Sequence, residues 1–277
     1  MLNVSELYIY PIKSLAGIKL NRAEVSDRGF KYDRRWMLID EHNRFISQRE
    51  VALMALLKVT IEDENLLITY NDTSLKVPFI FENKAVIEVT IWDDTCEALL
   101  IDEKIDKWFS KHLDMNCRLV YMPDASLRVT DPRYAPAGSV TSFADAYPFL
   151  LISQASLDDL NSRLEMAVPI DRFRPNIVIS GGLPYQEDEI DECTINGISF
   201  YGVKLCARCN IPTIDQQTAK AGKEPSKTMA RYRLKNNKIY FGQNLIHSGT
   251  GNIAVGDEVN VLSQHTEERF FIQRNNL

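Results

Sequence analysis

The chain has 277 residues, a formal net charge of −6, 45% hydrophobic and 25% charged residues. This is the composition of an ordinary soluble globular protein, and the length allows one large domain or two moderate ones. The negative charge argues against nucleic acid as a partner, and no apolar run approaches the roughly 20 residues of a membrane span. Five sparse cysteines and the absence of a signal-peptide pattern predict a cytoplasmic protein without a disulfide framework.

Short runs rich in β-branched and aromatic residues recur along the whole chain and predict strands. Turn-forming pairs separate them, and Asn196-Gly197 between two such runs is typical of a tight hairpin. We expect strands at Leu7–Tyr10, Trp36–Asp40, Leu57–Ile61, Leu66–Tyr70, Val86–Trp92, Arg118–Met122, Phe149–Ile152, Asn176–Ser180, Thr194–Tyr201, Lys238–Phe241 and Glu258–Leu262.

Two segments show the apolar spacing of a helix. Asp102–Leu113 repeats its apolar side chains on one face, and Ser153–Leu164 begins with a serine that can cap a helix. Many strands with few helices predict a mainly β fold with some α (α+β), built as a β-barrel or sandwich with appended helices. The segment Pro123–Ala146, rich in proline, aspartate, serine and alanine, is the expected connector between two halves.

The segment Cys206-Ala207-Arg208-Cys209 places two thiols and a guanidinium close together. Thiolates are soft ligands and nucleophiles, and a neighbouring positive charge favours the thiolate form of a cysteine. The pattern has three interpretations, which are half of a zinc site, a thioredoxin-like dithiol, and one functional cysteine with an incidental neighbour.

A zinc site needs four ligands, usually as two pairs, and the other cysteines and histidines stand apart in the sequence. The thioredoxin interpretation requires a βαβ context, whereas the run around Pro212 is typical of a strand or loop. We therefore favour one functional cysteine, Cys209, with Cys206 as a small buried side chain. Exchange between Cys206 and Cys209 as a disulfide pair stays an alternative.

Three segments place basic or hydroxyl side chains at the ends of predicted strands. They contain Lys13 and Ser14, the pair Arg34-Arg35, and Arg174 before Pro175, which biases Arg174 toward an extended backbone. Arginine binds phosphate through two donors, and lysine and serine add a charge and a hydrogen bond. Together they would hold a phosphorylated anion near Cys209, although each segment taken alone is more often a solvated surface.

The stretch Lys220–Lys238 contains seven basic residues and one acid, Glu224. A solvated face explains such a stretch, because charged residues are usually exposed. Its functional interpretation is a docking face for an acidic protein, since complementary charge steers encounter.

Read in order, these motifs resemble those of MOSC-domain proteins, in the group that includes the mitochondrial amidoxime-reducing component and its bacterial relatives. The resemblance runs through Ile9-Tyr10-Pro11-Ile12-Lys13-Ser14, Asp33-Arg34-Arg35-Trp36, Pro148-Phe149-Leu150, Ser153–Leu164, Phe173-Arg174-Pro175-Asn176-Ile177-Val178-Ile179-Ser180-Gly181, Cys206-Ala207-Arg208-Cys209, Thr213-Ile214-Asp215, Lys223-Glu224-Pro225 and Phe241-Gly242-Gln243.

The resemblance implies an N-terminal β-barrel-like domain over residues 1–122 and a MOSC β-barrel with a few helices over residues 123–277. It also implies the molybdenum cofactor, a pterin dithiolene with a phosphate, with Cys209 as the molybdenum ligand. The cofactor-binding residues that it implies are Lys13, Ser14, Arg34, Asp145, Arg174, Asn176, Arg208 and Asn244. The chain departs from the mitochondrial members at Asn244, where they have tyrosine, and at Ala207.

The activity implied is reduction of N-hydroxylated small molecules such as amidoximes, hydroxylamines and N-hydroxylated base analogues. Electrons would come from a separate ferredoxin-, flavodoxin- or cytochrome b5-like protein, for which Lys220–Lys238 is the expected dock. Catalytic roles fall to Cys209 and Asp215. Asp215 would relay protons or orient the loop that carries Cys209. The alternative is a non-catalytic carrier of the cofactor or of its sulfur, since MOSC domains also occur in molybdenum cofactor sulfurases.

Overall fold

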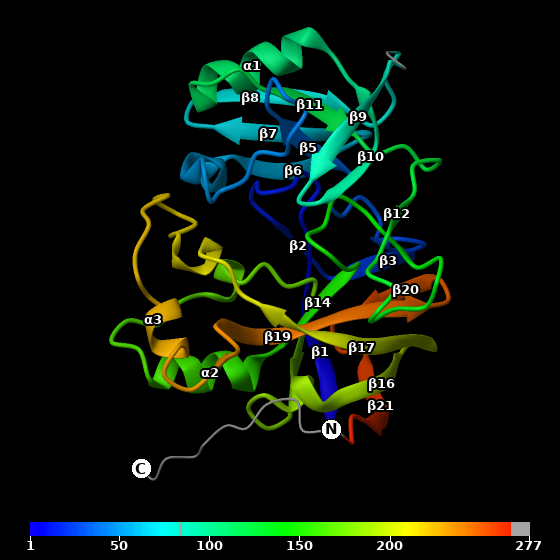
Figure 1. Ribbon diagram of the computed structural model, residues 1–277, viewed down its shortest axis with the longest axis vertical. Helices are drawn as coiled ribbons and strands as arrows, with labels where there is room; N and C mark the ends of the chain where they lie inside the picture. Colours follow the sequence, from blue (N-terminus) through cyan, green and yellow to red (C-terminus); the bar gives the residue numbers. More distant parts are fainter. Residues whose placement is uncertain (83–84, 267–277) are drawn as a thin grey trace.

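The protein is described by a computed structural model that places residues 1–82 and 85–266. Figure 1 shows two lobes, with the sheets of the N-terminal half and one helix in the upper lobe and the largest sheet with two helices in the lower lobe. Strands dominate and helices are few, which confirms the expected mainly β fold with barrel-containing α+β architecture.

The lower lobe is built on a nine-stranded sheet within the described residues. Seven of its strands follow the order β14-β15-β1-β21-β16-β17-β19, and a further pairing between β14 and β19 closes them into a barrel. All neighbours around the barrel are antiparallel except β14 and β15. The strands of this sheet are β1 (Leu2–Ile9), β2 (Ile18–Leu20), β14 (Phe149–Ser153), β15 (Ile177–Ser180), β16 (Ile190–Ile195), β17 (Ile198–Ala207), β18 (Leu234–Lys235), β19 (Lys238–Ser248) and β21 (Glu258–Gln264).

The upper lobe combines two smaller antiparallel sheets that share one apolar core with the first helix. The buried side chains at this core include Trp36, Leu66 and Phe109, which come from all three elements. The four-stranded sheet contains β5 (Trp36–Ile39), β11 (Arg118–Tyr121), β10 (Asp94–Leu100) and β9 (Val86–Ile91), and the three-stranded sheet contains β6 (Lys58–Glu62), β7 (Asn65–Tyr70) and β8 (Thr73–Pro78).

Short strands lie between the two lobes. One group pairs β20 (Gly251–Ala254), β3 (Arg22–Ser26) and β4 (Gly29–Phe30), and another pairs β12 (Arg128–Val129) with β13 (Val140–Thr141). The second pair lies inside the predicted connector Pro123–Ala146, so this segment is partly ordered as a hairpin. The predicted division after residue 122 stays a prediction, although β1 itself lies in the lower barrel between β15 and β21.

Both predicted helices are present. Asp102 and Ser153 cap α1 (Glu103–Leu113) and α2 (Gln154–Ser162) by accepting hydrogen bonds from the backbone of Lys104 and Ala155, as capping residues do. The other helical segments are α3 (Ser226–Met229) and the 3₁₀ helices η1 (Ala52–Leu56), η2 (Ile170–Arg172), η3 (Gln186–Glu189) and η4 (Ile211–Thr213). Across residues 1–82 and 85–266, no helix combines the length and hydropathy needed to cross a membrane.

The hairpin predicted at Asn196-Gly197 is confirmed. Ile195 pairs with Ile198, and Asn196 and Gly197 have φ values of 46° and 78°, which suit a tight turn. The strand predicted at Thr194–Tyr201 is therefore two strands joined by this turn. Strands without a strong apolar run, including β3, β8 and β10, are absent from the predicted set.

Gly202 on β17 is tightly enclosed by neighbouring strands of the barrel. A Cβ atom at this position would lie 2.1 Å from the Ile190 carbonyl oxygen and 1.9 Å from Nε2 of Gln243. That nitrogen donates a hydrogen bond to the same carbonyl, so neither neighbour is free to move away. Only glycine fits here without displacing strand backbone.

We predict that Gly202→Ala lowers the free energy of unfolding by about 2 to 3 kcal/mol, because the added methyl group overpacks the barrel. Urea unfolding followed by circular dichroism measures the change. Gly222→Ala is the matched control, since its nearest heavy atom would be the Thr213 carbonyl oxygen at 3.6 Å, and it should stay within about 0.5 kcal/mol of wild type. Equal effects of the two substitutions would contradict the packing argument.

Candidate functional site

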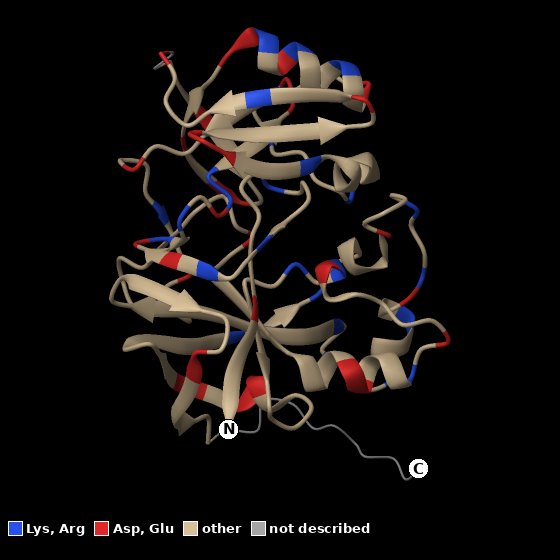
Figure 2. Cartoon of the chain, turned by 180° about the vertical axis from the view of Figure 1, so that it is seen from behind, with Lys and Arg blue, Asp and Glu red and all other residues tan. Residues whose placement is uncertain are grey.

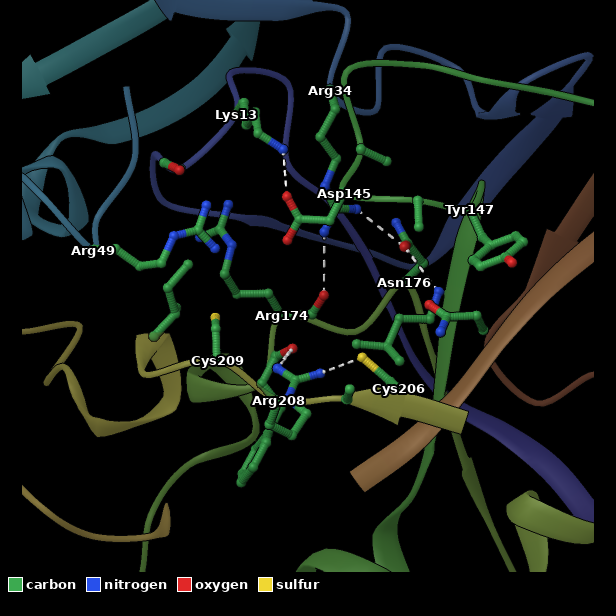
Figure 3. A pocket seen from close by; sticks show the side chains of 18 residues that line it. Lys13, Arg34, Arg49, Asp145, Tyr147, Arg174, Asn176, Cys206, Arg208 and Cys209 are labelled. Atoms are coloured by element: carbon green, nitrogen blue, oxygen red, sulfur yellow. Dashed lines mark hydrogen bonds and ion pairs between the residues drawn. The ribbon is translucent and has the colours of Figure 1, made fainter. Parts of the chain in front are cut away.

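A pocket lies where segments from both halves of the chain meet (Figure 3). Lys13 and Ser14 reach it from the turn after β1, Arg34 from the turn before β5, and Arg208 and Cys209 from the end of β17. The structure thus brings together most of the residues that the sequence predicted for the site. Those that line the pocket are Lys13, Ser14, Arg34, Asp145, Arg174, Asn176, Arg208, Cys209 and Asn244.

Positive charge dominates the pocket. Among the described residues that line it, five side chains are cationic and Asp145 is the single acid; the cations are Lys13, Arg34, Arg49, Arg174 and Arg208. Such a surplus of guanidinium and ammonium donors in a concave site favours a ligand with several negative charges.

Lys13 and Asp145 form an ion pair at the edge of this group. The Lys13 ammonium donates to Oδ1 of Asp145 at 2.6 Å and to the Phe143 carbonyl oxygen at 2.8 Å. Burial lowers the pKa of Lys13 to about 8, and Asp145 only partly offsets that effect. Burial also tends to raise the pKa of Asp145, but Lys13, Arg49 and Trp92 outweigh it and hold that pKa well below its ordinary value. Because 57% of the Asp145 side chain is accessible through the open pocket, water screens the pair.

Arg34 is fixed by two buried polar groups. Its Nη1 atom donates to Oδ2 of Asp33 at 2.6 Å and to Oδ1 of Asn176 at 3.0 Å, and its Nη2 atom donates to the Arg174 carbonyl oxygen. Asp33 also accepts a hydrogen bond from the Tyr10 backbone at 2.8 Å. Burial raises the pKa of Asp33, and its contacts with Arg34 and Tyr10 counteract that shift. A carboxylate behind the pocket therefore orients the guanidinium that faces into it.

Tyr10 supports two of the cations with its ring. The guanidinium carbons of Arg34 and Arg174 lie 4.3 Å and 4.2 Å from the ring centroid, which is cation–π geometry. Gly17 makes room for this ring, because a Cβ atom there would lie 2.4 Å from it. Burial lowers the pKa of Arg174 to about 10, with a further contribution from Arg34. The Tyr10 ring thus stabilises two like charges that line the pocket.

Three residues that line the pocket have left-handed backbone conformations. The φ values are 69° at Ser14, 50° at Arg34 and 55° at Arg174, although none of these residues is glycine. Such strain is uncommon and gathers at functional sites. The extended conformation expected for Arg174 from Pro175 is therefore wrong. The Arg174 backbone instead donates to the Asp171 carbonyl oxygen, which turns the chain after η2.

Cys209 follows the end of β17 and precedes η4, so its backbone leaves the sheet at the pocket. Arg208 next to it donates to the Phe173 carbonyl oxygen at 2.7 Å and to the sulfur of Cys206 at 3.1 Å. Burial raises the pKa of Cys206, with opposing effects from Arg208. The sequence predicted Cys206 as a small buried side chain. In the structure it is partly buried against the apolar core, and it also lines the pocket.

Asp215 is the predicted site residue that the structure leaves outside the pocket lining. Its carboxylate pairs with Arg172 at 2.6 Å and accepts hydrogen bonds from the backbone of Gln217 and Thr218. Arg172 also donates to the Pro212 carbonyl oxygen at 3.3 Å. Asp215 thereby fixes the loop that follows Cys209. These contacts correspond to the orienting role, and its catalytic role stays a prediction.

Sequence reasoning missed Arg49, which lines the pocket from the loop after β5. Its neighbour Gln48 is buried, donates to the Ser14 carbonyl oxygen at 2.6 Å, and exchanges amide hydrogen bonds with Gln216. The bonds between Gln48 and Gln216 join the two halves of the chain. The available signal was the polar run Ser47-Gln48-Arg49 directly after the apolar pair Phe45-Ile46, in a segment with no predicted strand.

The loop that carries Asp145 is held by a second missed residue, Arg128. This buried side chain donates to the carbonyl oxygens of Ser142, Ala144 and Asp145 and to the carboxylate of Asp94 on β10. Because Arg128 lies on β12 within the connector, the connector fixes the position of the acid in the pocket.

The fold and pocket define a class of protein with two β-rich parts and a pocket, formed by segments of both, that is lined by cations and a thiol. The sequence matches the MOSC N-terminal beta barrel domain over residues 1–116 and the MOSC domain over residues 138–260. Lys13, Arg34 and Arg49 lie in the first matched region, and Arg174 and Cys209 lie in the second.

Three named relatives narrow this class. Mitochondrial amidoxime-reducing component 1 of Mus musculus is 34% identical over 281 residues, which cover 94% of this chain and 82% of that protein. The Homo sapiens protein of the same name is 32% identical over 285 residues, covering 94% and 83%. Molybdenum cofactor sulfurase of Oryza sativa subsp. japonica is 31% identical over 263 residues, covering 87% of this chain and 32% of that protein. The chain belongs to the MOSC-domain family that includes the mitochondrial amidoxime-reducing components.

The lowered pKa of Lys13 predicts a pH-dependent affinity for anions. Below pH 8 its ammonium is charged and attracts an anion, and above pH 8 it loses a proton and that attraction. Sulfate keeps its charge over this range, so its affinity at constant ionic strength should fall roughly tenfold between about pH 7 and pH 9.5. Isothermal titration calorimetry measures it. Lys13→Arg stays charged and should remove the dependence; a decline that persists in this variant would assign it to another group.

Proposed function

We propose that this protein is a molybdenum-cofactor-dependent oxidoreductase that reduces N-hydroxylated compounds such as amidoximes, hydroxylamines and N-hydroxylated base analogues. The observation that carries the proposal is the pocket with five cations beside Cys209, formed by both matched regions of the family. The relatives named for amidoxime reduction align over more than four fifths of their length. The proposal therefore rests on the residues of the site and on similarity over nearly the whole chain, and not on the fold alone.

The residues of the pocket fit the molybdenum cofactor. The cofactor carries a phosphate, and Nη1 of Arg49 and Nε of Arg208 are buried without a hydrogen-bond partner among the residues that the structure describes. Buried donors normally have partners, so these two favour an anionic ligand. Molybdenum binds soft sulfur ligands, and Cys209 supplies one beside the cationic surface.

When bound, the cofactor supplies the two-electron chemistry, and the protein binds and orients it. In our proposal Cys209 holds the metal, and Lys13, Ser14, Arg34 and Arg174 hold the anionic group. The further binding residues are Asp145, Asn176, Arg208 and Asn244. Asn176 lines the pocket from the position just before β15, and Asn244 lines it from β19. The Asn244 side chain is fixed by a hydrogen bond that it donates to the Lys204 carbonyl oxygen.

The protein's own groups also handle protons. Reduction of an N–OH group to N–H takes up two electrons and two protons and releases the oxygen as water. Lys13 holds a proton at Nζ, hydrogen-bonded to Asp145, and its pKa of about 8 is close to neutral pH. Of the two roles expected for Asp215, its contacts with Arg172 support the orienting one. We therefore assign Asp215 to positioning the loop after Cys209.

Electrons are proposed to come from a separate acidic protein of the ferredoxin, flavodoxin or cytochrome b5 type. The face for it is the basic segment Lys220–Lys238, at the right in Figure 2. Gly222 donates its backbone N–H to the Thr213 carbonyl oxygen at 2.9 Å, so this segment starts against η4, next to Cys209. Its exposed basic residues are Lys220, Lys223, Lys227, Arg231, Lys235 and Lys238. The cytoplasmic location stays a prediction.

Charge reversal on this face tests the donor proposal. Lys223→Glu with Lys227→Glu should slow reduction by an acidic protein donor roughly tenfold at low salt, because the attraction that steers encounter is lost. Added salt should reduce the difference in rate between this variant and the wild type, because it screens the charges. Reduction by dithionite needs no docking and should be unchanged. Lys76→Glu, exposed on β8 in the upper lobe, is the control. If this control slows the donor reaction equally, the dock is elsewhere.

The ligand role of Cys209 is tested by metal content. Protein purified from a host that makes the cofactor should contain near-stoichiometric molybdenum, and Cys209→Ala should retain less than about a tenth of it. Inductively coupled plasma mass spectrometry makes the measurement. Cys206→Ser is the matched control, because it changes the other thiol of the same segment, and should keep both metal and benzamidoxime reduction.

Three outcomes would contradict parts of this assignment. Equal molybdenum in wild type and Cys209→Ala would remove Cys209 as the ligand. Metal-loaded protein without reductase activity that passes cofactor to an apo-enzyme would favour the carrier. Absence of metal from every variant, with loss of function in Cys206→Ser, would favour a thiol–disulfide protein.

A further inference from the structure

Trp92 occupies a position where tryptophan is unfavourable for the backbone. It lies in the two-residue turn between β9 and β10, where Ile91 pairs with Asp94. Its φ value is 57°, in the left-handed region that such turns usually fill with asparagine, aspartate or glycine. A bulky residue with this conformation is an outlier, and outliers of this kind point to function.

The turn places the Trp92 indole at the rim of the pocket. Its Nε1 atom donates to Oδ1 of Asp145 at 3.3 Å, and the guanidinium carbon of Arg49 lies 4.2 Å from its ring centroid. Phe45 packs against the ring at 5.2 Å between centroids. Asp145 and Arg49 both line the pocket, so a hairpin of the upper lobe carries this aromatic ring to the edge of the site.

The ring is not covered by these contacts. Trp92 remains 48% exposed, whereas Trp36 is buried in the core of the upper lobe. Nε1 is the one polar atom of the indole and is already bonded to Asp145, so the part of the ring that Arg49 and Phe45 leave uncovered is apolar. A flat apolar face beside a strongly polar pocket suits a ligand with one polar end and one planar end.

We propose that Trp92 forms an aromatic subsite at the mouth of the pocket, which takes the planar conjugated part of an N-hydroxylated substrate. The proposal rests on the proposed function and narrows its substrate class. The N-hydroxyl end enters the pocket on the side of Cys209, and the conjugated group stacks on the indole. Saturated substrates of equal size lack a flat π face and gain less from the ring.

The test uses a matched pair of substrates with the holoenzyme. Benzamidoxime and cyclohexanecarboxamidoxime carry the same reactive group on a planar and a saturated ring. We expect Trp92→Ala to raise the KM for benzamidoxime roughly tenfold and to leave that for the saturated analogue within about twofold, with kcat nearly unchanged for both. Equal changes for the two substrates, or none, would overturn the subsite.

Two further variants separate stacking from support of Asp145. Trp92→Phe keeps a ring and loses the N–H donor, so it should retain most of the preference for benzamidoxime. If it behaves like Trp92→Ala, Trp92 acts through Asp145 and the subsite is wrong. Trp92→Gly suits the left-handed backbone and removes the ring, so it should fold normally and lose the preference. Thermal unfolding checks this point.

Binding without turnover distinguishes this proposal from the proposed function. The chain has three tryptophans, and in Trp108→Phe only Trp92 and the buried Trp36 remain. Benzamidoxime added to this holoprotein without an electron donor should quench its fluorescence more than the saturated analogue does. Quenching that depends on Trp92 without any reduction would keep the subsite and reject the reductase. If the protein reduces both substrates and Trp92 affects neither KM nor quenching, the reductase assignment stands and the aromatic subsite is rejected.

Discussion

The ammonium and guanidinium groups that line the pocket repel one another, and the surrounding structure is arranged to hold them together in spite of that repulsion. Asp33 balances Arg34 from behind, and the Tyr10 ring lies against both Arg34 and Arg174. Backbone carbonyl oxygens of Phe143, Leu15 and Phe173 accept hydrogen bonds from three of the cations. A bound anion relieves the remaining repulsion, so ligand binding and folding stability are thermodynamically linked.

This constraint explains why the site draws on both halves of the chain. One segment would have to place all five cations within a few residues, where neighbouring side chains point in different directions. Instead, separate turns and loops each contribute one or two of the cations. The buried Gln48–Gln216 amide pair joins loops from the two halves of the chain. Left-handed backbone at Ser14, Arg34 and Arg174 turns their segments toward the common pocket.

Local chemistry made part of this structure predictable. Helix caps at Asp102 and Ser153 and the Asn196-Gly197 turn depend on neighbouring residues, so the sequence reveals them directly. The motifs that resemble the family led to most pocket residues. Arg49 and Trp92 were missed because their importance comes from contacts with distant segments. The backbone of Arg174 was wrongly predicted because a hydrogen bond after η2 overrides the preference set by Pro175.

The pairing of β1 has a consequence for the order of events during synthesis. This strand emerges from the ribosome early, yet its barrel partners β15 and β21 begin at Ile177 and Glu258. The barrel therefore closes only after most of the chain has been made, and contacts of such long sequence separation slow folding. Until then β1 has only the short strand β2 as a neighbour, so its apolar face is exposed to chaperones or aggregation. Insertion of any cofactor into the finished pocket consequently has to wait until β21 has been made.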